Sequence, residues 1–128
     1  PQFIRLNFPN GDMVGHFADL EATIASIECM DIALKRLAKK IDELGGVMLI
    51  TADHGNAEEL FDKTGEPKTA HTTNKVPFII YDNTENKDYY EIANLEHPGL
   101  SNIAATIATL LGRDNYPDAS QKPLIVLK

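Results

Sequence analysis

The chain has 128 residues, of which 43% are hydrophobic and 24% charged, so it is long enough to bury a core and too apolar for a disordered segment. Asp and Glu outnumber Lys and Arg by 19 to 12, and the net charge of -7 argues against a nucleic-acid surface. No apolar run approaches the roughly 20 residues of a membrane span, and no signal-peptide pattern opens the chain, so we expect a cytoplasmic protein with no membrane partner.

The first third of the chain predicts a strand followed by a long helix. Residues 3–8 alternate apolar and polar side chains, which is typical of a strand, and residues 9–12 are turn formers that predict a loop. From Leu20 to Leu44, apolar residues recur at steps of three and four, which predicts an amphipathic helix. We expect Asp19 to cap its first turn and Gly45 to supply the left-handed residue that ends it.

The rest of the chain continues the alternation of strands and helices. Val47–Thr51 is a short apolar run of the kind found in a strand covered on both faces, and residues 76–81 predict another strand. A second amphipathic helix is predicted from Leu100 to Leu111, with Ser101 as its N-cap and Gly112 as its end. The order of elements therefore predicts an α/β fold with a largely parallel sheet flanked by helices.

Two segments fall outside this alternation. Residues 82–98 are polar and predict irregular structure, whereas residues 124–127 form a short apolar stretch near the end of the chain. The single cysteine, Cys29, excludes an internal disulfide, and we expect it to be buried within the long helix. No linker divides the sequence, so we expect residues 1–128 to lie in one domain.

The candidate ligands of a metal occur in three segments next to predicted strands. Each segment carries a histidine, and two of them add an aspartate: Asp12 with His16, Asp53 with His54, and His71. Because loops from neighbouring parallel strands meet at one edge of a sheet, we expect these side chains to converge. A single histidine in such a loop is as well explained by a structural hydrogen bond, but the repeated pattern favours a metal site.

Imidazole and carboxylate ligands without a thiolate suit Mn²⁺ or Zn²⁺. Five candidate ligands are more than one catalytic metal needs with a position left open, so two ions are expected. Asn56 and Thr72 either orient the ligands or satisfy the backbone of their loops, and the sequence does not decide between these roles. We expect His97, which has no carboxylate at a comparable strand end, to be a surface or packing residue.

A nucleophile for covalent phosphoryl transfer is not evident near these loops. The serines are Ser26 in the long helix, Ser101 at a predicted cap and Ser120 near the end of the chain. Basic residues that would hold a phosphate are also absent from the three ligand-bearing segments.

At these motifs the sequence resembles the cofactor-independent (2,3-bisphosphoglycerate-independent) phosphoglycerate mutases of the alkaline phosphatase superfamily. The resemblance lies in residues 3–8, 12–16, 49–58, 69–74 and 76–78. It implies an alkaline-phosphatase-like fold and the conversion of 3-phosphoglycerate to 2-phosphoglycerate through a phosphoserine intermediate, with two manganese ions. The family thus implies a glycolytic isomerase that acts on a small molecule and is monomeric.

The resemblance also implies a division of the ligands between two metals. Asp12, His16 and His71 would hold one ion, and Asp53 and His54 would contribute to the other. In the family, the second ion is completed by an aspartate and a nucleophilic serine far upstream, and neither has a counterpart here.

The chain therefore resembles the C-terminal portion of the family's phosphatase domain, and we expect an incomplete domain that is inactive alone. Two alternatives remain open on the sequence. One is another metal-dependent phosphomutase or phosphatase of the same superfamily, such as a phosphopentomutase, which shares the Asp-His-Gly motif. The other is a metal-binding module without catalysis of its own.

Overall fold

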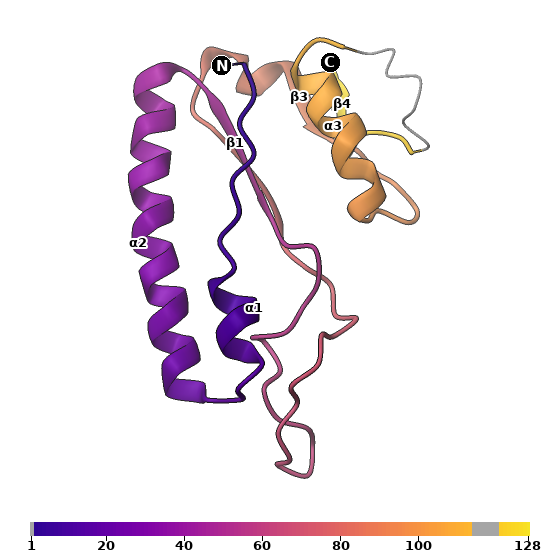
Figure 1. Cartoon of the computed structure of the whole chain (residues 1–128). Coiled ribbons are helices and arrows are strands. Elements are labelled where there is room, and N and C mark those ends of the chain that lie inside the picture. The colour runs from indigo at the N-terminus through magenta and orange to yellow at the C-terminus, as the bar shows by residue number, and fades with distance from the viewer. Residues whose placement is uncertain (1, 114–120) are drawn as a thin grey trace. The chain divides into compact units, whose positions relative to one another are not determined.

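The computed structural model describes residues 2–113 and 121–128 of the chain, and Ser120 lies outside this range. The described residues form helices and two small sheets, and the chain divides into two compact units, Pro1–Tyr81 and Asp82–Lys128 (Figure 1). The combination of helices and sheets agrees with the predicted α/β class. In the described range, no helix combines the length and the apolar character that a membrane crossing requires.

The first unit begins with an extended segment and a short helix, where a strand and a loop were predicted. Residues 2–9 form no strand, and α1 follows at Asn10–Gly15. The strand prediction was wrong because a strand needs hydrogen bonds to a neighbour, which side-chain alternation cannot supply. The loop prediction was wrong because residues that form turns also begin helices: the Met13 N–H donates to the Pro9 carbonyl at 2.9 Å and starts α1.

The long helix α2 spans Leu20–Leu44, as predicted, and both of its ends are built as expected. The Asp19 side chain accepts a hydrogen bond from the Ala22 N–H at 2.9 Å, which satisfies one free donor of the first turn. Gly45 has a φ of 62°, in the left-handed region that ends many helices. α2 contacts α1 through Ser26, whose hydroxyl donates to the Asn10 carbonyl at 3.3 Å.

The apolar stripe of α2 is only partly covered. Ile24 and Leu44 are 50% and 69% exposed, whereas Ile27 and Leu37 are half-buried. Cys29 is exposed, so the prediction that it is buried was wrong. On the helix, Cys29 lies on the same side as Ile32, which is itself 63% exposed, and away from the half-buried Ile27 and Met30.

Two strands complete the first unit's sheet. β1 spans Val47–Thr51, as predicted, and pairs with β2 at Phe78–Asp82, which starts two residues later than expected. Pro77 precedes the strand, consistent with its lack of a donor for the ladder. Val47 and Thr51 are exposed and the residues between them half-buried, so the expectation of a strand covered on both faces was wrong. The parallel arrangement of the predicted sheet stays a prediction.

The second unit contains more regular structure than its polar sequence predicted. A 3-10 helix, η1, spans Glu85–Tyr89, and β3 follows at Tyr90–Ile92. β3 pairs antiparallel with β4, which spans Ile125–Leu127. The prediction of irregular structure was therefore wrong in part, because β3 is fixed by pairing with a segment more than 30 residues away.

The last helix begins later than predicted. Leu100–Asn102 form a 3-10 turn, η2, and α3 spans Ile103–Leu110. Asn102, rather than Ser101, occupies the N-cap position; its side chain accepts from the Gly99 N–H at 2.7 Å and donates to the Lys122 carbonyl at 2.8 Å. Gly112 has a φ of 68° and follows the helix end as expected.

The core of the second unit lies between α3 and β4. Ile125 and Thr106 are fully buried, and Ala105 and Leu124 are nearly so. The Thr106 hydroxyl donates to the Asn102 carbonyl at 2.8 Å and accepts from the Leu124 N–H at 2.8 Å, so its polar group is satisfied where it is buried.

Candidate metal centre

The helix α1 presents the first two predicted ligands on one face. Asp12 and His16 are four residues apart, so their side chains lie one turn apart on the same side of the helix. His16 Nε2 is 3.2 Å from Asp12 Oδ1, and His16 Nδ1 contacts the Thr69 carbonyl. Gly15, between them on α1, is buried.

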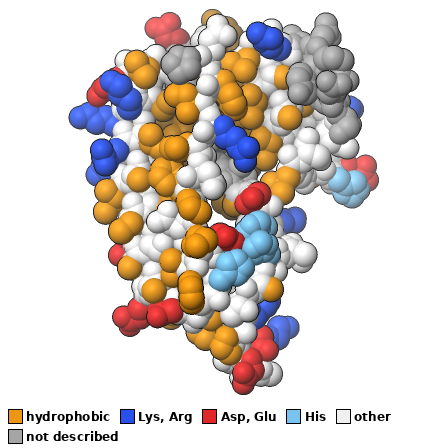
Figure 2. Space-filling view, in the orientation of Figure 1, with side chains coloured by type: hydrophobic (Ala, Val, Ile, Leu, Met, Phe, Trp, Pro, Cys, Tyr) orange, Lys and Arg blue, Asp and Glu red, His pale blue; other side chains and the backbone are white. Residues whose placement is uncertain are grey.

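His54 and His71 bring two further imidazoles to the same carboxylate. His71 Nε2 lies 2.9 Å and His54 Nε2 3.7 Å from Asp12 Oδ1. The two rings are stacked, with centroids 3.6 Å apart and planes 14° from parallel. Ligand atoms of Asp12, His54 and His71 all lie within 4.8 Å of one another, as a shared ion requires. Figure 2 shows histidine side chains gathered beside acidic ones.

The remaining predicted ligand is at the edge of this group. Asp53 is 91% exposed, and its Oδ1 lies 3.7 Å from His54 Nε2. Asp12 thus contacts histidines from both of the ligand sets that the family resemblance implies. The division into two sets stays a prediction, as does the role of each residue as a ligand.

The contacts of the histidine rings are compatible with metal binding. The Thr69 carbonyl can accept a hydrogen bond from His16 Nδ1, and in that tautomer of the neutral ring the Nε2 lone pair faces the Asp12 side and can bind a metal. His54 Nδ1 faces the Gly55 carbonyl at 3.3 Å in the same way. In the described part of the chain, the ion-pair partners of Asp12 are all histidines. The carboxylate of Asp12 and the imidazoles of His54 and His71 therefore fit a divalent cation, with His16 beside them on α1.

Among the described residues, no side-chain hydrogen bond joins Asn56 or Thr72 to a candidate ligand. The Thr72 N–H donates to the Gly55 carbonyl at 2.9 Å, and its hydroxyl donates to Glu58. Asn56 is 5% exposed, and neither polar atom of its side chain has a hydrogen-bond partner among the described residues. Its amide oxygen fills the space that a Cβ on Gly15 would need, so Asn56 packs directly against α1.

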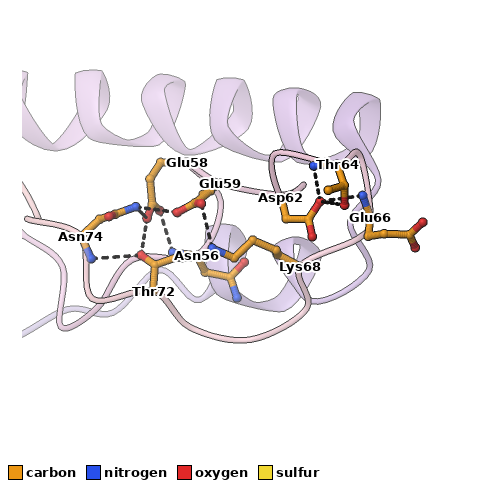
Figure 3. Close-up of polar contacts among 9 residues, drawn as sticks. All are labelled: Asn56, Glu58, Glu59, Asp62, Thr64, Glu66, Lys68, Thr72 and Asn74. Carbon is orange, nitrogen blue, oxygen red and sulfur yellow. Dashed lines mark hydrogen bonds and ion pairs between the residues drawn. The ribbon is translucent and has the colours of Figure 1, made fainter.

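Glu58 is a polar residue of this region that sequence reasoning missed. Its carboxylate accepts from the Asn56 N–H at 2.7 Å, the Thr72 hydroxyl and the Asn74 side-chain amide at 3.0 Å (Figure 3). Partial burial by itself raises the pKa of Glu58, but these hydrogen bonds outweigh it and lower the pKa to about 2. In the sequence, Glu58 is the last residue of the 49–58 segment that carries the family resemblance, but that resemblance gave it no role of its own.

In the described part of the first unit, the one serine is not placed as a nucleophile. Ser26 is engaged with the Asn10 carbonyl, and Ser101 is exposed in η2, in the second unit. His97 is 90% exposed beside Glu96, as expected of a surface residue.

Comparisons with known proteins place these observations in a family context. Residues 1–115 match the Metalloenzyme superfamily. The chain is 44% identical over 124 residues to a 2,3-bisphosphoglycerate-independent phosphoglycerate mutase of Moorella thermoacetica, with 97% of this chain and 23% of that protein covered. It is 50% identical over 112 residues to the Synechococcus elongatus protein of the same name, with 85% and 21% covered.

A solved structure is similar as well. A crystal structure of Leishmania mexicana phosphoglycerate mutase, determined at low cobalt concentration, matches with a TM-score of 0.85 and 37% identity. The match covers 97% of this chain and 25% of that one. The chain thus spans about a quarter of the length of the relatives it matches.

Proposed function

Because the chain belongs to the Metalloenzyme superfamily, we propose that it is the C-terminal portion of the phosphatase domain of a phosphoglycerate mutase. The complete enzyme would interconvert 3-phosphoglycerate and 2-phosphoglycerate through a phosphoserine intermediate. The observation that carries this proposal is the convergence of three histidines on one oxygen of Asp12. The reaction is inferred from two relatives, 44% and 50% identical to the chain, that are named as phosphoglycerate mutases.

The proposed cofactor is a pair of Mn²⁺ ions, for which Zn²⁺ or another divalent metal could substitute. Asp12, His16 and His71 would hold one ion, and Asp53 and His54 would contribute to the other. Divalent cations at such a site neutralise phosphate charge and activate an oxygen nucleophile. Asp53 is exposed and adjacent to His54, so it is free to join a ligand set that other parts of the enzyme complete.

The role of this chain's residues is to bind and orient. Asp12 supplies the negative charge of the centre, and the carbonyls of Thr69 and Gly55 orient the rings of His16 and His54. The nucleophilic serine and the groups that hold the substrate would come from other parts of the enzyme. We further propose that the enzyme is cytoplasmic and monomeric and that its partner is the small phosphoglycerate substrate rather than nucleic acid or a membrane.

A chimaera tests the proposal directly. The quarter of the Moorella thermoacetica relative that matches this chain would be replaced by residues 1–128, and formation of 2-phosphoglycerate from 3-phosphoglycerate would be measured with Mn²⁺. We expect activity in the chimaera, loss of activity with His71→Ala, and no loss with the matched control His97→Ala. A folded but inactive chimaera would refute the mutase proposal and favour the metal-binding module without catalysis.

A further inference from the structure

Glu58 joins the two segments that carry His54 and His71. The backbone N–H of Asn56, two residues after His54, donates to Glu58 Oε2 at 2.7 Å. The hydroxyl of Thr72, the residue after His71, donates to Glu58 Oε1. A single carboxylate therefore bonds one segment through each of its oxygens (Figure 3).

A backbone contact accompanies this link. Gly55 and Thr72 form an isolated antiparallel bridge, in which the Thr72 N–H donates to the Gly55 carbonyl at 2.9 Å. A Cβ on Gly55 would collide with both the Thr72 hydroxyl and the Glu58 carboxylate. Glycine at position 55 thus leaves the space in which the carboxylate reaches Thr72.

The donors around Glu58 outnumber the acceptors that a neutral replacement could offer. Asn74 also donates to Oε1, at 3.0 Å, so three donors face the two oxygens. The low pKa of Glu58, about 2, keeps the side chain ionised and able to accept all three bonds at neutral pH. A glutamine would turn one oxygen into a donor and leave at least one N–H or O–H group without an acceptor.

We propose that Glu58 is a positioning residue that holds the His54 and His71 segments at the spacing at which both imidazoles face Asp12. The stacked rings, with centroids 3.6 Å apart, lie on the two segments that the carboxylate joins. This inference rests on the metal centre of the proposed function. It adds to that centre a residue that is not itself a ligand, Glu58, which joins the segments that carry His54 and His71.

The test compares metal affinity in Glu58→Gln with that in Glu59→Gln. The second variant is a matched control because the Glu59 carboxylate also accepts from Asn74, at 3.0 Å, and pairs with Lys68, but it accepts no bond from Asn56 or Thr72. The purified chain would be titrated with Co²⁺, followed by its visible absorption spectrum, below the unfolding temperature of every variant. We expect Glu58→Gln to weaken Co²⁺ binding by roughly 10-fold or more, as loss of a residue that orients ligands does, and Glu59→Gln to leave it unchanged.

If Glu58→Gln does not fold, a second pair of variants tests the positioning role of Glu58. Thr72→Val removes one hydrogen bond to Glu58 while keeping the side-chain volume, and Thr72→Ser keeps the hydroxyl. We expect weaker Co²⁺ binding and an altered spectrum in Thr72→Val, with both restored in Thr72→Ser.

The outcomes separate the two proposals. If Glu58→Gln or Thr72→Val lowers only the unfolding temperature and leaves Co²⁺ affinity and spectrum unchanged, Glu58 has a purely structural role and the positioning proposal is wrong. If the unsubstituted folded chain binds neither Co²⁺ nor Mn²⁺, the metal centre itself is refuted, and the positioning role with it.

Discussion

Asp12 is the residue around which the candidate metal centre is organised, because one of its oxygens faces the Nε2 atoms of three histidines. The three distances differ, from 2.9 Å for His71 to 3.7 Å for His54. Such a cluster of imidazoles around a carboxylate is stable either with protons or with a cation between the groups, and metal binding therefore competes with protonation.

The metal ligands are expected to differ in importance. His71→Ala should weaken the tightest metal-binding event more than His54→Ala does, because His71 lies closer to Asp12 and belongs to the ligand set proposed to be complete within this chain. Calorimetric titration of the chain with Mn²⁺ measures this, with His97→Ala as the control that should bind like the unsubstituted chain. A larger loss in His54→Ala would show that the proposed division of ligands is wrong.

Gly15 is a second residue whose substitution should have a defined cost. An alanine at position 15 would place its Cβ against the amide oxygen of buried Asn56, so Gly15→Ala should lower the free energy of unfolding by about 1–3 kcal/mol. Urea denaturation measures the change. Gly46→Ala is the control, since a Cβ there makes only ordinary contacts of 3.6–3.7 Å with Ile41. Adding Asn56→Ala to Gly15→Ala should recover part of the loss, and failure to do so would exclude the clash as its cause.

Among the elements, α1 has the largest effect on the candidate centre, although it has only six residues. It places Asp12 and His16 one turn apart on one face, whereas a loop over the same residues would leave that spacing undefined. α2 supports α1 through the contact of Ser26 with Asn10, and a Cβ on Gly11 would lie 3.4 Å from Ile27. The two helices therefore fix the position of the Asp12 carboxylate, which the three histidines face.

In the second unit, the side chains of Asp82, at the end of β2, and Tyr90, at the start of β3, form a hydrogen bond. The Tyr90 hydroxyl donates to Asp82 Oδ2 at 2.8 Å, and the Thr84 N–H donates to Asp82 Oδ1 at 2.8 Å. Partial burial and the bond to Asp82 raise the pKa of Tyr90 to about 12. Burial opposes ionisation of Asp82, but the hydrogen bonds from Thr84 and Tyr90 outweigh it and lower the pKa of Asp82.

These shifts predict a pH dependence with a definite sign. The stabilisation from Tyr90 is fully present below the ordinary tyrosine pKa of about 10 and is lost as pH rises through about 12. The stabilisation from Asp82 is present above the ordinary pKa of an aspartate and is lost as pH falls through its lowered value. In an alkaline absorbance titration, the difference between the chain and Tyr90→Phe should show a tyrosine that ionises near pH 12. Asp82→Asn should move that ionisation to lower pH, and an unchanged titration would contradict the pairing.

At the scale of the whole molecule, the chain carries the candidate metal centre but no placed nucleophile among its described residues. Its Ser26 hydroxyl is engaged by Asn10, and its length is about a quarter of that of the relatives it matches. Many large apolar side chains are exposed in the first unit, including Phe3 at 54%, Ile4 at 71% and Phe17 at 78%. These residues would be available to pack against other parts of a longer enzyme.

The 128-residue chain should therefore have no measurable mutase activity alone, because metal ligands cannot replace the serine that accepts the phosphoryl group. The purified chain would be incubated with Mn²⁺ and 3-phosphoglycerate, and 2-phosphoglycerate would be measured over time. The chimaera described above is the positive control. Sustained product formation by the chain, at a rate proportional to its concentration and abolished by His71→Ala, would overturn this expectation.

Local features of the sequence determined α2, with its caps at Asp19 and Gly45, and the strand β1, because hydrophobic periodicity and capping act within a few residues. The loop positions of His54 and His71 also followed from the sequence. The short helix α1, the β3–β4 pair and the role of Glu58 were decided by tertiary structure. Each has partners distant in the chain: α1 contacts Ser26 of α2, Glu58 accepts from Thr72 and Asn74, and β3 pairs with β4. Such contacts leave no periodic signal, because the residue types that make them are equally common on exposed surfaces.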